Sequence, residues 1–274
     1  MPLDAARGAV IAVQARLIEA LAAENTRLAG QVAGLAARVE RLERLASRNS
    51  GHSSMPPSAD DLPGRAARIS HHEAMGELIV LRHGETEWSR ALRHTGRTDL
   101  PLTPAGEAAA AALAPALAAR PVRAVFTSPA RRAVTTAALA GLTGAKEDPD
   151  LQEWDYGGYE GRTTAEIQAE RPGWYLWRDG VIPGDAAHPG ETLAEVGARA
   201  DAVLARVRPL LAEGDVALVA HGHLLRVLTA RWLRLEPADG RLFQLKTAAL
   251  STLGTEHGEP VITSWNVPPT AYPG

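Results

Sequence analysis

From Glu77 onward, short apolar segments with the character of strands alternate with segments that have the character of helices. The sequence predicts strands at 77–81, 122–127, 215–220, near 248–254 and 259–264, and helices at 130–140 and 222–233. Such alternation is typical of an α/β domain with a mainly parallel sheet. We therefore expect a three-layer α/β/α fold with its chemistry at the C-terminal ends of the strands.

Further helices are predicted from their start signals. Thr103 is a candidate N-cap followed by proline at the first helical position. Thr163 and Thr192 each precede a glutamate by three residues, which is the spacing of a capping box.

The N-terminal part of the chain has a different pattern. Residues 11–45 carry a seven-residue repeat with branched aliphatic residues and Asn25 at one seam position and mostly leucine at the other. This pattern favours a parallel two-stranded coiled coil, in which the buried asparagine fixes the register. We expect residues 1–46 to form this helix and residues 11–45 to make a parallel homodimer. A single amphipathic helix lying on the main domain is the alternative.

Residues 47–74 change character abruptly and are rich in Ser, Gly, Pro and Asp, so we predict a flexible linker. The heptads together with residues 48–60 resemble the N-terminal segment of certain insertion-sequence transposases, which implies an interaction module at most. Residues 1–74 carry 9 basic and 8 acidic side chains, a balance that does not favour nucleic acid as a partner. Residues 75–274 are then the main domain.

Composition excludes several classes of protein. The chain has 274 residues, a formal charge of −3 and no cysteine, so disulfides, thiolate nucleophiles and cysteine-based zinc sites are absent. No apolar run approaches the roughly 18 residues of a membrane helix. The N-terminus lacks the pattern of a signal peptide. We therefore expect a soluble cytoplasmic protein with no membrane contact.

Three predicted strands end in residues that can carry chemistry. The first ends in Arg82-His83-Gly84-Glu85-Thr86, the second in Ser128-Pro129-Ala130-Arg131-Arg132, and a later one in His221-Gly222-His223. Because the C-terminal ends of parallel strands meet at one edge of a sheet, these side chains should converge on one crevice.

These motifs, together with 151–161, resemble in their order the histidine phosphatase superfamily, also called the phosphoglycerate mutase-like fold. The resemblance spans roughly residues 77–265. It implies that His83 becomes a phosphohistidine that water then hydrolyses, with a small phosphorylated molecule as substrate and with no metal or cofactor. Within the family, the sequence is most similar to broad-specificity acid phosphatases and sugar-bisphosphate phosphatases.

The residue types suit this chemistry. Arg82, Arg132 and His221 would neutralise the phosphate and stabilise the transferring phosphoryl group. His83 must be neutral to attack, and two neighbouring arginines should lower its pKa. The helix that begins at Gly222 could add an anion-binding N-terminus.

The leaving alkoxide needs a proton, and the resemblance assigns this role to Glu153. Asp155 lies close by and is the alternative acid. His223 is expected to be structural, or to act behind the catalytic residues. A zinc site at His221 and His223 would need a third ligand, and none has suitable spacing, so no metal site is predicted.

Residues around the motifs bear on the substrate site and on the type of reaction. By resemblance, Thr95 and Gly96 line the substrate site, and Ser89 stands where mutases usually have asparagine. Together with the Trp154–Asp155 pair, which lacks positive charge, this departure favours hydrolysis over transfer. A phosphoglycerate mutase is the first alternative, and a coiled-coil adaptor with a vestigial phosphatase domain is the second. Trp174, Tyr175 and Trp177 form either a substrate-facing lid or a small aromatic core.

Overall fold

The computed structural model describes residues 76–271 of the chain. The predicted coiled coil and the linker, with their transposase-like segment, lie outside the described residues and stay predictions. The same holds for the homodimer through residues 11–45.

The described residues build one mixed sheet of six strands in the order β3-β2-β4-β1-β5-β6. Strands β1 to β4 run parallel, and β5 is antiparallel to both β1 and β6. The strands are β1 (Leu78–Arg82), β2 (Val122–Thr127), β3 (Lys146–Glu147), β4 (Asp215–Ala220), β5 (Leu250–Glu256) and β6 (Glu259–Val267). The sequence missed β3, because two residues are too few to show a period.

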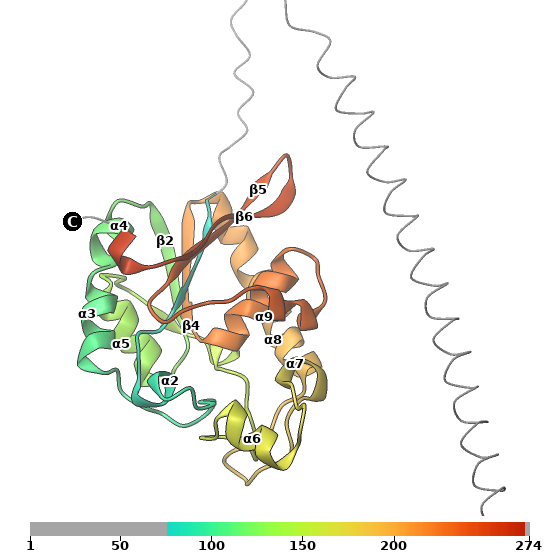
Figure 1. Ribbon diagram of the computed structural model, residues 1–274. Helices are drawn as coiled ribbons and strands as arrows, with labels where there is room; N and C mark the ends of the chain where they lie inside the picture. The colour runs from blue at the N-terminus through green and yellow to red at the C-terminus, as the bar shows by residue number, and fades with distance from the viewer. Residues whose placement is uncertain (1–75, 272–274) are drawn as a thin grey trace, which may run out of the picture. The chain divides into compact units, whose positions relative to one another are not determined.

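Helices cover both faces of this sheet (Figure 1). In chain order they are α2 (Glu87–Arg90), α3 (Pro104–Ala111), α4 (Ala114–Ala118), α5 (Arg131–Leu139), α6 (Thr164–Glu170), α7 (Leu176–Asp179), α8 (Leu193–Val207) and α9 (Gly222–Trp232). Short 3₁₀ segments are η1 (Pro149–Leu151), η2 (Arg208–Ala212), η3 (Pro237–Leu242) and η4 (Pro269–Ala271).

The predicted helix starts are confirmed. The hydroxyl of Thr103 accepts the N–H of Gly106 at the start of α3. Thr163 and Thr192 form reciprocal capping boxes with their glutamates at the starts of α6 and α8. Each cap satisfies backbone donors that the first helical turn leaves unpaired.

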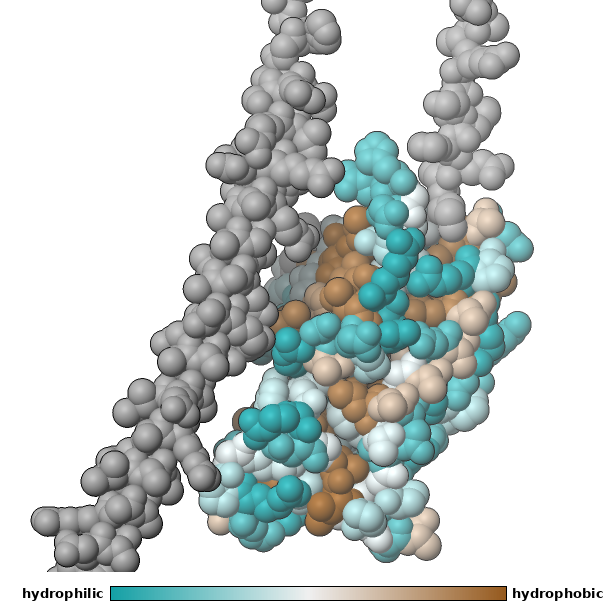
Figure 2. Space-filling model, turned by 90° about the vertical axis from the view of Figure 1, so that its right-hand side faces the viewer, coloured by the Kyte–Doolittle hydropathy of each residue, from teal (hydrophilic) through white to brown (hydrophobic). Residues whose placement is uncertain are grey.

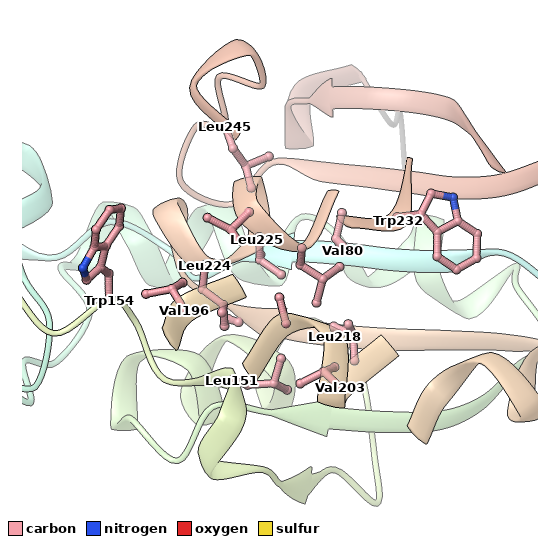
Figure 3. Close-up of a cluster of buried hydrophobic side chains, with 14 of the residues drawn as sticks. Val80, Leu151, Trp154, Val196, Val203, Leu218, Leu224, Leu225, Trp232 and Leu245 are labelled. Carbon is pink, nitrogen blue, oxygen red and sulfur yellow. The ribbon is translucent and has the colours of Figure 1, made fainter. Parts of the chain in front are cut away.

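The core lies in two clusters, one on each face of the sheet. Alternate residues of β1 point to opposite faces, so that Leu78 and Val80 pack with α8 and α9, while Ile79 and Leu81 pack with α3, α4 and α5. Figure 3 shows the first cluster, with Trp154 and Trp232 at opposite ends and Val80 and Leu218 between them. Two packed faces make the expected three layers.

The register of the parallel strands positions the site. Arg82 at the end of β1 is paired with Ala220 at the end of β4. The residue that follows each strand is a histidine, so His83 and His221 lie side by side, with ring centroids 5.1 Å apart. On the other side of β4, Thr127 of β2 pairs with Val219, which brings Ser128 to the same edge.

The surface of the domain mixes polar and apolar residues. On the face drawn in Figure 2, hydrophilic and apolar residues are interspersed. Within residues 76–271, no helix has the length and apolar character that crossing a membrane requires.

Candidate active site

A cavity of about 800 Å³ lies where β1 and β4 end. His83 and Arg82 contribute to its wall from the end of β1, and Gly222 and His223 contribute from the start of α9. Of the three strand ends that the sequence places at one crevice, the residues after β1 and β4 line the cavity, whereas Ser128 and Arg132, which follow β2, do not.

His83 is oriented with one ring nitrogen free. Its Nδ1 lies 2.7 Å from the carbonyl oxygen of Gly84, and a carbonyl can only accept, so Nδ1 carries the hydrogen. Burial, together with the positive charges of Arg132 and Arg82, lowers the pKa of His83 well below its ordinary value of 6.5. A neutral ring with its proton on Nδ1 leaves the lone pair of Nε2 available.

Arg132 and His221 form a buried pair behind His83. The Nε of Arg132 donates to Nδ1 of His221 at 3.2 Å, so the proton of the neutral His221 ring is on Nε2, which donates to Ser128 Oγ at 2.7 Å. Neither Arg132 nor His221 lines the cavity, and both are fully buried. Burial and Arg132 lower the pKa of His221 well below 6.5, so the free protein holds a neutral donor there instead of the expected cation.

Arg82 is held close to the start of α9. Its Nη1 donates to the carbonyl of Leu245 at 2.7 Å. Its buried Nε has no hydrogen-bond partner within the part of the chain that the structure describes. A Cβ on Gly222 would lie only 3.2 Å from Cζ of Arg82, so glycine lets the guanidinium approach the helix. Because Arg82 lines the cavity, its guanidinium is a candidate contact for an anionic ligand.

Glu153 lines the cavity and caps α9. Its Oε1 accepts the backbone N–H groups of Trp154 and Leu224, and its Oε2 accepts that of His223. Two N–H groups of the first helical turn are therefore bonded to this carboxylate, and the expected anion site at the helix N-terminus is largely filled by the protein itself.

Asp155, the alternative acid, does not line the cavity. Its carboxylate accepts the N–H of Gly157 at 3.0 Å and lies 3.6 Å from Nε of Arg97. Trp154 is also buried away from the cavity, so the lack of positive charge in this pair carries no information about the substrate.

Of the expected substrate-binding residues, Ser89, Thr95 and Gly222 line the cavity, whereas Gly96 does not. The carbonyl of Gly96 accepts Nη2 of Arg132 at 3.0 Å, and its N–H donates to Glu160 at 2.9 Å. The loop around Gly96 holds Arg132 in place, and that contact depends on how the loop folds back on α5.

The structure adds cavity residues that sequence reasoning missed. Among them are Arg93, His94, Tyr156 and Arg226. For Arg226 a signal existed, because it follows His223 by three residues on α9 and therefore shares its helix face. Tyr156 lies within the motif at 151–161, whereas Arg93 and His94 come from a loop with no local signal.

The aromatic segment lines the cavity and also contributes to the core. Trp174, Tyr175 and Trp177 all line the cavity. Trp174 and Trp177 are also buried in the first core cluster, while Tyr175 is 44% exposed. A wall of the cavity is thus part of the core. In residues 76–271 no three His, Cys, Asp or Glu side chains gather as a metal-binding group.

Comparison with known proteins gives consistent matches. The family model for the histidine phosphatase superfamily (branch 1) matches residues 78–268. The chain is 41% identical over 185 residues to a Mycobacterium tuberculosis protein named acid phosphatase, covering 66% of this chain and 87% of the relative. It is 37% identical over 189 residues to the Saccharomyces cerevisiae protein named sedoheptulose 1,7-bisphosphatase, covering 57% and 67%. A solved structure of a Mycobacterium tuberculosis open reading frame matches with a TM-score of 0.66 and 38% identity, covering 71% of this chain and 98% of that one.

Proposed function

Because the chain belongs to the histidine phosphatase superfamily and is a phosphoric monoester hydrolase, we propose that it hydrolyses small phosphomonoesters through a phosphohistidine on His83. The relatives named acid phosphatase and sedoheptulose 1,7-bisphosphatase support sugar phosphates or similar molecules as the substrate class. The reaction uses side chains alone and needs no metal ion.

The orientation of His83 carries this proposal. A nucleophilic imidazole must be neutral and must present one unprotonated nitrogen to phosphorus. The bond from Nδ1 to the carbonyl of Gly84 and the lowered pKa of His83 supply both conditions before substrate binds. No proton has to leave the ring at the moment of attack.

The reaction proceeds in two steps. Nε2 of His83 attacks phosphorus, the bond to the leaving oxygen breaks, and Glu153 gives that oxygen a proton. Water then attacks the phosphohistidine while Glu153 takes a proton from it, and the N–P bond breaks to release phosphate. The place of Glu153 on the cavity wall supports it over Asp155 in this role.

Positive charge stabilises the phosphoryl group in both steps. Arg82 lines the cavity beside His83, so we assign its guanidinium the direct contact. Arg132 acts from behind His83 by its charge, which the low dielectric of a buried site strengthens. His221 has an Nε2–H that can turn from Ser128 to a phosphate oxygen.

The test is a panel of phosphorylated sugars, glycerates and p-nitrophenyl phosphate, assayed in EDTA with wild type and His83→Ala. We expect activity in EDTA, its loss in His83→Ala, and an acid-labile, alkali-stable phosphoenzyme in rapid-quench samples of wild type. Activity that disappears in EDTA would contradict the metal-free reaction. Turnover by His83→Ala equal to that of wild type would contradict the nucleophile.

Glu153→Gln and Asp155→Asn form a matched pair for the acid. Glu153→Gln should lose much more activity on sugar phosphates than on p-nitrophenyl phosphate, whose leaving group departs without a proton. Asp155→Asn should change the activities on sugar phosphates and on p-nitrophenyl phosphate to the same extent, or change neither of them. Activity that depends on a bisphosphorylated primer would favour the mutase alternative, and an inactive wild type would favour the adaptor.

A further inference from the structure

One arginine on the cavity wall has neither a carboxylate partner nor a part in the proposed reaction. Three arginines and a single glutamate line it, although acidic side chains outnumber basic ones from residue 75 onward, 24 to 20. Arg82 lies beside His83 and serves the reacting phosphate. Arg93 is paired with Glu166 at 3.3 Å. Arg226 has no carboxylate within ion-pair distance anywhere in residues 76–271.

Arg226 is nevertheless held in a fixed orientation. Its guanidinium lies over the ring of Trp177, 4.7 Å from the centroid. Nε donates to the carbonyl of Gly240 at 3.1 Å, and Nη2 donates to that of Arg241 at 3.0 Å. A Cβ on Gly240 would come within 2.7 Å of the Trp177 ring, so the stack is closely packed. A fork that is already ordered loses little conformational entropy when it binds a ligand.

Keeping Arg226 charged in this position carries a free-energy penalty. Burial lowers the pKa of Arg226, which reflects the penalty of keeping the cation partly out of water. A buried charge without a counter-ion is unfavourable. An anionic ligand in the cavity would offset that penalty, and Nη1 makes no hydrogen bond within the described part of the chain.

The surface around Arg226 is neutral and largely aromatic. Burial lowers the pKa of His223 well below 6.5 and that of His94 to about 4, so neither ring adds a charge at neutral pH. Trp174 and Trp177 are among the residues that line the cavity together with Arg226. Such a wall fits an uncharged carbon skeleton lying between two anionic ends.

We propose that Arg226 binds a second anionic group of the substrate, a carboxylate or a second phosphate, while the reacting phosphate lies at His83 and Arg82. This rests on the proposed function and narrows it: the preferred substrates carry two acidic groups joined by a short polyol or sugar. The guanidinium fork suits both kinds of oxyanion, because each offers two acceptor oxygens in one plane.

The experiment compares three phosphomonoesters: a polyol phosphate with no second acid, a phosphoglycerate and a sugar bisphosphate. The readout is the ratio of kcat/KM on a doubly acidic substrate to kcat/KM on the polyol phosphate. We expect Arg226→Gln to lower this ratio by about tenfold or more, chiefly through KM, because a charged hydrogen bond is lost. The doubly acidic compound that wild type prefers identifies the carboxylate or the phosphate as the bound group.

Two further variants keep the test decisive. Arg226→Lys keeps the charge without the fork and should lower the ratio less. Arg231→Gln removes a charge from the same helix, where Arg231 pairs with Asp201 at 2.9 Å and does not line the cavity, and should leave the ratio unchanged. An unchanged ratio in Arg226→Gln, or equal losses on all three substrates, overturns the proposal.

Failure of the proposed function would look different. In that case wild type hydrolyses none of the three compounds. Calorimetric binding of the same compounds to His83→Ala, with and without Arg226→Gln, still decides the role of Arg226. Tighter binding of the doubly acidic compounds that disappears with Arg226→Gln supports it, and equal affinity for all three in both variants overturns it.

Discussion

Replacing Gly222 by alanine should lower activity without lowering stability. The new Cβ would lie 3.2 Å from Cζ, 3.3 Å from Nε and 3.4 Å from Nη1 of Arg82. These distances are shorter than ordinary van der Waals contact, so the guanidinium must move by a few tenths of an ångström. The bond from Nη1 to the Leu245 carbonyl, at 2.7 Å, has to lengthen or rotate to permit this.

The two effects of this substitution have opposite signs. Gly222 is the first residue of α9 and is not among the glycines with positive φ, so alanine fits its backbone. Alanine is preferred over glycine in helices by up to about 1 kcal/mol, which offsets the cost of the tighter contact. A misplacement of about 1 Å at a reacting centre can cost roughly 100-fold in rate, so a few tenths should cost about tenfold in kcat/KM.

The assay combines thermal unfolding with steady-state kinetics on p-nitrophenyl phosphate. The midpoint of unfolding should stay within a few degrees of the wild-type value or rise. Ala194→Gly, at an exposed position in the first turn of α8, is the matched control. It should lower the free energy of unfolding by roughly 0.5–1 kcal/mol and leave kcat/KM unchanged.

Two results would contradict this role of Gly222. If Gly222→Ala has the kcat/KM of wild type, the position of Arg82 does not limit the reaction. If activity falls only in parallel with a loss of stability, the substitution acts on folding rather than on Arg82.

Two other predictions concern the support of the site and its response to pH. The carboxylate of Glu160 accepts the N–H groups of Gly96 at 2.9 Å and Thr98 at 3.0 Å, in the loop that holds Arg132. Glu160→Ala should therefore lower the free energy of unfolding in urea by about 1–3 kcal/mol and reduce kcat as well. Glu160→Gln keeps one acceptor and should lower the free energy of unfolding by less. Equal stability of wild type and both variants would contradict this. The free energy of unfolding should also fall as the pH drops below 6.5, since burial lowers the pKa of His94 to about 4 in the folded protein and the unfolded chain takes up the proton first. Protonation linked to His94 should lower the free energy of unfolding by roughly 3 kcal/mol at pH 4. In His94→Gln, the free energy of unfolding in urea should therefore fall less steeply between pH 6.5 and pH 4. A dependence on pH as steep as that of wild type would refute this.

The longer strands, the helices with clear start signals and the edge at which they meet follow from the sequence alone, whereas β3 and the short helices α2, α4 and α7 do not. β4 has the predicted bounds, and the helix starts at Thr103, Thr163 and Thr192 form as expected, because strand period and capping depend on residues only a few positions apart. His83 and His221 follow directly after paired strand ends, so their proximity could be inferred from the order of the motifs.

Which side chains line the cavity depends on contacts between segments that are far apart in the chain. Glu153 and Asp155 are two residues apart, and their different surroundings come from α9, whose first turn is more than sixty residues further along the chain. Gly96 turns toward Arg132 instead of the cavity, and Arg226 reaches the cavity because Trp177 and the carbonyls of η3 hold it there. Contacts between distant segments depend on how loops pack, and local sequence patterns carry no record of that packing.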